Sequence, residues 1–244
     1  MTSLFRIFIA LTVLLSGSIE LSAHNQNGNY IKKYINETTR TVNTKPYSII
    51  SVSGPMDVYL EKGNEGDITV TAEAAVQDKI VVDSDGDTLT ISLVNNVSLH
   101  NAGKIKITVP FEDISEISLR GSGEVEGKDV IKTNTMSLNL LGSGNINVNV
   151  ESNTLDAKLN GSGNIQVSGA AKDIDAKTTG SGNFIGKEFI TENAQIYISG
   201  SGDSTIYAKT SLKARVKGSG GIYYLGNPGT NDVKVLGSGK VKPL

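Results

Sequence analysis

A serine flanked by two glycines recurs through the second half of this chain, and a serine hydroxyl is a potential catalytic nucleophile. The seven Gly-Ser-Gly copies begin at Gly121, Gly142, Gly161, Gly180, Gly200, Gly218 and Gly237. A nucleophilic serine needs a neighbouring general base, usually a histidine, and the chain contains only His24 and His100. Because these two cannot serve seven equivalent serines, we predict no triad chemistry.

Glycine-rich loops also bind ions and phosphates, but neither pattern fits. Calcium-binding β-rolls repeat about every nine residues, with an Asp in each repeat. These tripeptides recur every 18 to 21 residues, and Asp203 is the one Asp at the corresponding place. A phosphate-binding loop leads into a helix, but here strand-like sequence follows. The chain has no cysteine, which excludes thiolate metal sites. We predict no metal and no cofactor.

Charged residues keep register with the tripeptides. Three positions before a tripeptide stand four cations, Lys158, Lys177, Arg215 and Lys234, and five positions before stand Asp156, Asp175 and Asp232. One interpretation is a solvated face whose opposite charges pair across strands. The other is a shallow cationic groove that binds an anionic glycan through the four cations.

A polysaccharide-active enzyme is the competing function. Such enzymes place carboxylates in a cleft at the scissile bond, and no long insertion interrupts these repeats to build a concave wall. We therefore predict that the protein is not an enzyme.

Two adjacent tyrosines, Tyr223 and Tyr224, stand in the most aromatic stretch of the chain. Two roles are open for them. They could cover the end of the core as a C-terminal cap, because solenoid ends need protection, or they could stack on a sugar ring.

The elements that position these residues follow from the period. Residues two and four positions before each tripeptide are apolar in 13 of 14 cases, and the second residue after it is apolar in six of seven. Alternate inward residues indicate one strand before and one after each corner. The prediction is an all-β parallel β-helix, or β-solenoid, with coils of about 19 residues closed by Gly-Ser-Gly corners. An antiparallel sandwich or prism has the same period and stays open.

Two glycines around a small hydroxyl suit a tight corner, where φ is positive and no Cβ fits against the next coil. A polar column beside the corners, formed by Glu124, Asn145, Asn164, Asn183 and Asp203, is expected to hydrogen-bond from coil to coil. The tripeptides are thus interpreted as structural.

The chain before the repeats divides into three parts. Arg6, an apolar run over 7–15 and small residues up to Ala23 are typical of a secretory signal peptide over 1–23. Residues 24–46 are expected to form a linker or leader segment. An N-terminal β region covers 47–120, with no more than one helical turn near Val76, and is continuous with the repeat solenoid over 121–244. No other stretch is apolar enough to cross a bilayer, and a net charge of −2 argues against a nucleic-acid partner.

Several segments resemble one known family. They are Ser53-Gly54 with Asp57-Val58-Tyr59-Leu60, the repeated Gly-Ser-Gly-Asn-Ile, and the closing run from Tyr223 to Pro228 with Gly237 to Val241. The chain resembles, over roughly 47–241, the auto-transporter adhesin head domain named after a Gly-Ile-Asn signature and widespread in Bacteroidetes-type bacteria. The resemblance implies an exported β-helical protein of the periplasm, outer-membrane surface or extracellular space. It brings no catalytic or ligand residues.

The sequence therefore leads to one functional hypothesis. The protein is expected to be a non-enzymatic adhesin or interaction module that contacts a glycan or another envelope protein along its repeated faces. The alternatives are the polysaccharide-active enzyme and a structural module that forms homo-oligomers through its rod ends or edges.

Overall fold

A computed structural model describes residues 18–24, 30–94 and 103–244, with side chains from residue 37 onward within these ranges. The N-terminal strands are β1 (Ser18–His24), β2 (Tyr30–Asn43), β3 (Ile49–Ser53), β4 (Asp57–Lys62), β5 (Asp67–Glu73), β6 (Ile80–Asp85), β7 (Thr88–Leu93) and β8 (Lys106–Phe111). The remaining strands are β9 (Glu116–Gly121), β10 (Glu124–Lys132), β11 (Thr135–Gly142), β12 (Asn145–Gly161), β13 (Asn164–Gly180), β14 (Asn183–Gly200), β15 (Ser204–Gly218), β16 (Gly221–Leu225), β17 (Thr230–Leu236) and β18 (Lys240–Pro243). The helix α1 (Ala74–Gln77) is the single turn expected near Val76.

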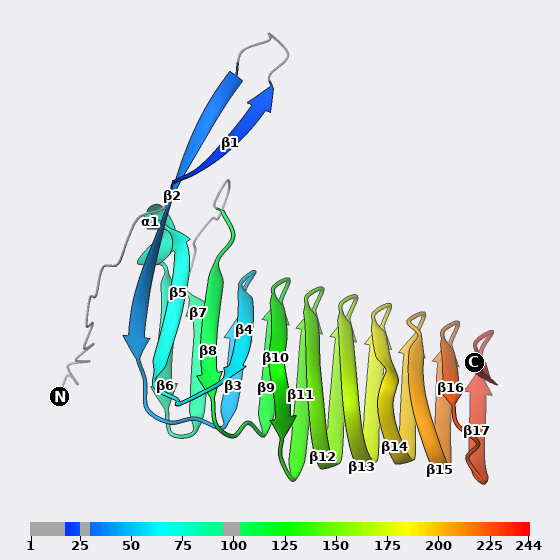
Figure 1. Cartoon of the computed structure of the whole chain (residues 1–244). Coiled ribbons are helices and arrows are strands. Elements are labelled where there is room, and N and C mark those ends of the chain that lie inside the picture. Colours follow the sequence, from blue (N-terminus) through cyan, green and yellow to red (C-terminus); the bar gives the residue numbers. More distant parts are fainter. Residues whose placement is uncertain (1–17, 25–29, 95–102) are drawn as a thin grey trace, which may run out of the picture.

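Parallel coils stack along one axis to form a rod (Figure 1). Between β12 and β13, Asn145 pairs with Asn164 and Gly161 pairs with Gly180, so each residue lies beside the one 19 positions later. The predicted parallel solenoid is confirmed, and the antiparallel sandwich is wrong for the repeats. Strands such as β12 run from one corner to the next without a break, so the predicted strands after one corner and before the next are continuous.

The coils produce two hydrogen-bonded ladders. Ladder 1 contains the strands that lead into the corners: β7, β3, β9, β11, the second halves of β12 to β15, and β17. Ladder 2 contains the strands that leave them: β8, β4, β10, the first halves of β12 to β15, β16 and β18. The inward side chains of the two ladders form the core.

The inward columns are buried as the sequence predicts. Small residues such as Ala157 and Ala176 on ladder 1 are 1% exposed, and so is the larger Phe184 on ladder 2. The exception is the last coil, where Val233 is 46% exposed.

Corner geometry explains both glycines of the tripeptide. The amides of Ser162 and Gly163 donate to the carbonyl oxygen of Gly142, at 3.0 and 3.1 Å. Gly161 has φ +138°, and a Cβ there would lie 2.1 Å from that same oxygen. A Cβ on Gly163 would lie 2.0 Å from the carbonyl oxygen of Gly144. Neither position therefore has room for a side chain.

From Asn145 onward, the polar column beside the corners is hydrogen-bonded from coil to coil, as expected. The Asn164 side-chain amide donates to Asn145 Oδ1, and the Asn183 amide donates to Asn164 Oδ1, both at 3.0 Å. The column continues because Asn183 Oδ1 accepts from the backbone amide of Asp203 at 2.9 Å, and Asp203 Oδ1 accepts from that of Gly221 at 2.7 Å.

The N-terminal strands do not stack in chain order. The coil of β3 and β4 lies between β7 and β8 on one side and β9 and β10 on the other. Beyond them, β6 pairs antiparallel with β7, β5 with β8, and β2 with β5, so antiparallel strands cover this end of the rod. The first 17 residues of the predicted signal peptide lie outside the described residues, and 18–23 belong to β1, which pairs with β2. The expected linker, 24–46, contains all of β2.

Candidate functional site

The outward face of ladder 1 carries the predicted cations in one column. Lys158 pairs with Lys177, Lys177 with Tyr197, Tyr197 with Arg215, and Arg215 with Lys234, on five successive strands. Successive strands lie about 4.8 Å apart, so the column extends over about 19 Å. The structure thus brings together all four cations that the sequence singled out.

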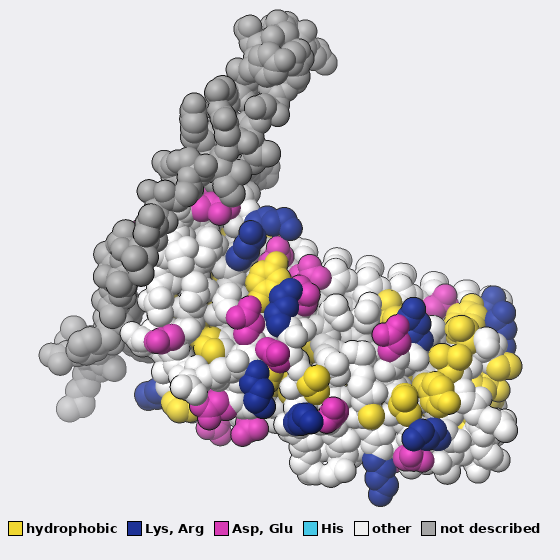
Figure 2. Space-filling view, in the orientation of Figure 1, with side chains coloured by type: hydrophobic (Ala, Val, Ile, Leu, Met, Phe, Trp, Pro, Cys, Tyr) yellow, Lys and Arg dark blue, Asp and Glu magenta, His cyan; other side chains and the backbone are white. Residues whose placement is uncertain are grey.

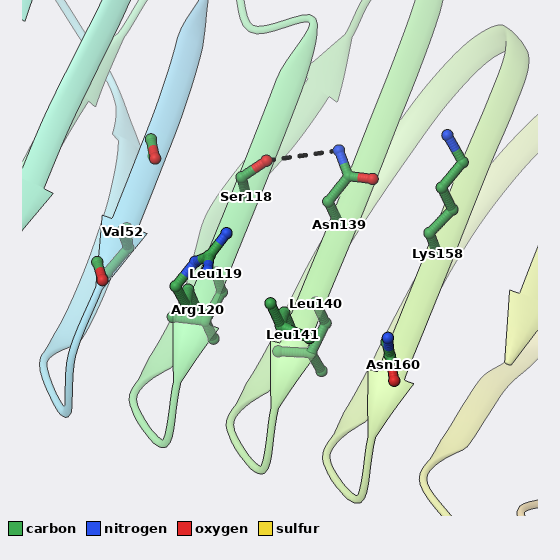
Figure 3. Close-up of a pocket in the computed structure, with 11 residues that line it drawn as sticks. Val52, Ser118, Leu119, Arg120, Asn139, Leu140, Leu141, Lys158 and Asn160 are labelled. Atoms are coloured by element: carbon green, nitrogen blue, oxygen red, sulfur yellow. Dashed lines mark hydrogen bonds between the residues drawn. The ribbon is translucent and has the colours of Figure 1, made fainter. Parts of the chain in front are cut away.

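Two shallow depressions lie along this face. The first has a volume of about 370 Å³ and is lined by residues of β3, β9, β11 and β12, with Lys158 at one side (Figure 3). Its floor is mostly uncharged. Asn139 donates from its amide to Glu116 Oε1 at 3.1 Å, and the Ser118 hydroxyl donates to the same oxygen at 2.9 Å.

The second depression holds the other three cations. Its volume is about 660 Å³, and its lining includes Lys177, Arg215 and Lys234 together with Lys213 and Lys217. It is an open groove across β13, β14, β15 and β17. Because its walls are outward side chains of neighbouring coils, an extended ligand can lie across the strands, parallel to the rod axis.

Some of the cations are already paired. Lys177 Nζ lies 3.0 Å from Asp175 Oδ2, and this hydrogen bond raises the pKa of the lysine. Arg215 forms an ion pair with Asp232 and also donates to its backbone oxygen at 2.7 Å. Their hydrogen bond raises the pKa of Arg215 and lowers that of Asp232. Within the ranges described, Lys158 and Lys234 form no ion pair, so opposite charges are paired at two of the four cations.

Tyr197 is the feature of this groove that the sequence argument did not select. Its half-buried ring has Lys177 Nζ at 5.5 Å and Lys213 Nζ at 5.9 Å from the centroid. The sequence could have indicated Tyr197, because it stands between Lys177 and Arg215 in the column three positions before the tripeptides. Lys213 stands five positions and Lys217 one position before the corner, in the outward columns on either side of Arg215.

The two predicted tyrosines lie elsewhere. Tyr223 and Tyr224 belong to β16 in ladder 2, where they pair with Lys242 and Pro243 of β18. A further coil therefore stacks beyond them, and they do not cover the end of the core. Tyr224 packs against the core instead, and the ring of Tyr223 has Lys240 Nζ at 5.7 Å and Lys242 Nζ at 5.5 Å.

The chemistry available on these faces is ionic and hydrogen-bonding contact. Among the described residues, no three His, Cys, Asp or Glu side chains gather in a way that could hold a metal ion. The helix in the described ranges is too short to cross a bilayer, and no other helix there qualifies.

Solved structures share this architecture. A protein described as a putative adhesin from Bacteroides fragilis superposes with a TM-score of 0.81 at 23% identity, over 86% of this chain and 97% of that one. A "putative lipid binding protein" from Parabacteroides distasonis gives 0.71 at 25% identity over 86% and 97%. A putative adhesin from Parabacteroides merdae gives 0.69 at 20% identity over 85% and 96%.

Sequence comparisons give the family. A search of curated proteins finds no match. A family model described as "Putative auto-transporter adhesin, head GIN domain" matches residues 46–228. That range takes in both ladders from β3 to β16 and all but the last of the Gly-Ser-Gly corners. The chain belongs to this auto-transporter adhesin head GIN domain family.

Proposed function

We propose that the protein is an exported, non-enzymatic adhesin of the cell envelope or surface that binds an acidic glycan along the outward face of ladder 1. Membership of an adhesin family supports a role in surface contact. The observation that carries the ligand class is the column Lys158–Lys177–Tyr197–Arg215–Lys234, in which four of five consecutive strands present a cation.

The balance of charge in this groove favours an anionic ligand. On ladder 1 from β12 to β17, the outward side chains include six cations against four carboxylates. The cations are Lys158, Lys177, Lys213, Arg215, Lys217 and Lys234, and the carboxylates are Asp156, Asp173, Asp175 and Asp232. Single exposed ion pairs are weak. A polymer with one negative charge per sugar can instead meet several cations at once, and linked contacts raise the overall affinity well above that of any one.

Binding to a glycan array tests the proposal. The combined substitutions Lys158→Gln, Lys177→Gln, Arg215→Gln and Lys234→Gln should abolish binding to acidic glycans. A control with the same change of charge replaces four exposed lysines elsewhere by glutamine: Lys45, Lys62, Lys79 and Lys172. The groove is not the site if the wild type binds no acidic glycan, or if the groove variant binds like the control.

Two further measurements test the remaining parts. Labelling of intact cells with a membrane-impermeant reagent should reach the protein if it is exposed at the surface. Incubation with acidic polysaccharides should release no reducing or unsaturated ends, and their release would restore the enzymatic alternative.

A further inference from the structure

The charge of the rod changes sign along its length. Residues 37–132 contain sixteen acidic and nine basic side chains, whereas residues 209–244 contain seven Lys or Arg and a single acid, Asp232. Figure 2 shows Asp and Glu side chains gathered over the N-terminal half of the visible face, with fewer toward the other end. The last coils are therefore a strongly cationic end on a molecule whose net charge is only −2.

Both ladders contribute cations to this end. On ladder 1, Lys217 of β15 pairs with Leu236 of β17, and Lys234 lies two residues before Leu236 on β17. On ladder 2, Lys240 and Lys242 belong to β18 and hold their ammonium groups over the ring of Tyr223. We name Lys217, Lys234, Leu236, Lys240 and Lys242 the C-terminal tip. The one acid nearby, Asp232, is already paired with Arg215.

The same end exposes apolar side chains. Val233 is 46% and Leu236 56% exposed, and both belong to β17, beside the tip lysines. Figure 2 shows hydrophobic side chains beside lysines or arginines over the last coils. A polysaccharide offers little to an exposed leucine, whereas a bilayer interface accepts apolar and aromatic side chains and attracts cations when its lipids are anionic.

We propose that the C-terminal tip binds the surface of a bilayer that contains anionic lipid. Lys217, Lys234, Lys240 and Lys242 contact the phosphate-bearing headgroups, and Leu236 enters the interface between them. The acidic N-terminal half is repelled by the same surface, so the rod is held with that half away from the bilayer. This site is separate from Lys158 and Lys177, and it does not rest on the proposed binding of glycan.

Cosedimentation with vesicles tests the tip. The full chain should pellet with vesicles of phosphatidylcholine mixed with phosphatidylglycerol, and not with phosphatidylcholine alone. Added salt should weaken binding because the charges are exposed. Each headgroup-contacting cation contributes about a fivefold factor in affinity, so Lys240→Gln with Lys242→Gln should weaken binding about 25-fold. Leu236→Ser should reduce the binding that remains at high salt.

Matched variants separate the possible results. Lys62→Gln with Lys79→Gln makes the same change of charge in the acidic half and should leave vesicle binding unchanged. The tip is refuted if wild type does not prefer anionic vesicles, or if the tip and control variants bind alike. It is also refuted if the tip variant loses acidic polysaccharide binding and keeps vesicle binding. Lys158→Gln with Lys177→Gln should leave vesicle binding unchanged. If the wild type binds no acidic glycan on the array, only the glycan proposal fails, because vesicle binding is measured independently.

Discussion

The corner glycines allow steric overlap and backbone strain to be tested separately. Gly161 combines φ +138° with a Cβ position 2.1 Å from the Gly142 oxygen, whereas Gly163 has the overlap, at 2.0 Å, without a positive φ. Gly86 has φ +56° with no atom within 4 Å of its Cβ position, and Gly229 has neither constraint. Alanine substitutions at these four positions therefore combine the presence or absence of steric overlap with the presence or absence of a positive φ.

The expected loss of stability follows from the structure. A non-glycine residue at such a φ costs about 1–3 kcal/mol. The carbonyl that a Cβ at position 161 would strike also accepts the amides of Ser162 and Gly163, and these bonds contribute about 0.5–1.5 kcal/mol each. Gly161→Ala should thus lower the free energy of unfolding by about 2–6 kcal/mol. Gly86 has the φ of a left-handed helix, so Gly86→Ala should cost about 1–2 kcal/mol, and Gly229→Ala should stay within about 0.5 kcal/mol of wild type.

Urea unfolding followed by far-ultraviolet circular dichroism measures these differences. Gly163→Ala should fall between Gly86→Ala and Gly161→Ala if overlap is the main term. The corner argument is wrong if Gly163→Ala is as stable as Gly229→Ala. It is equally wrong if Gly161→Ala unfolds like the wild type and loses only ligand binding.

Three further predictions concern the column, the core and pH. Asn164→Ala removes two hydrogen bonds between coils and should cost about 1–3 kcal/mol in urea unfolding, whereas Asn160→Ala, at an exposed position, should be nearly neutral. Phe184→Ala opens a cavity under a side chain that is 1% exposed and should cost about 3–5 kcal/mol by the same assay, and a small loss would mean that the core closes around the gap. Burial raises the pKa of the Tyr47 phenol, so the folded protein holds this group in its neutral form more strongly than the unfolded chain does. The contribution of Tyr47 to the free energy of unfolding is therefore complete below about pH 10 and should fall as the pH rises above that value. Tyr47→Phe should flatten that dependence in a pH series of unfolding midpoints, and an unchanged slope would contradict the assignment.

The sequence specifies the repeats well because each coil repeats one local pattern. Inward columns such as the one through Ala157 and Ala176, the corner glycines and the asparagine column all follow from counting positions relative to the tripeptide. Even the uneven spacings are absorbed locally. Between β14 and β15 the register shifts near Gly186 and Ile190, because the repeat that begins at Gly180 has 20 residues and the next has 18.

The N-terminal arrangement was not predictable in the same way. The coil of β3 and β4 turns at Gly54-Pro55-Met56 instead of Gly-Ser-Gly, and no local pattern says which later strands will stack on each side of it. Side-chain partners were also out of reach. The column shared by Lys177 and Arg215 was visible in the sequence, but the position of Tyr197 between two lysines and the pairing of Arg215 with Asp232 depend on three-dimensional register.

The position of the β3–β4 coil inside the stack makes the two ends of the rod unequal for truncation. This coil is synthesised before both of its neighbours, so each of its edges stays open until later sequence arrives. A chain shortened from the C-terminal side at a corner loses whole coils and keeps the rest of the ladder intact. Deletion of residues 49–62 instead removes an interior layer, and β7 and β8 would then have to meet β9 and β10 directly. We therefore expect truncation at a C-terminal corner to be tolerated better than removal of the β3–β4 coil.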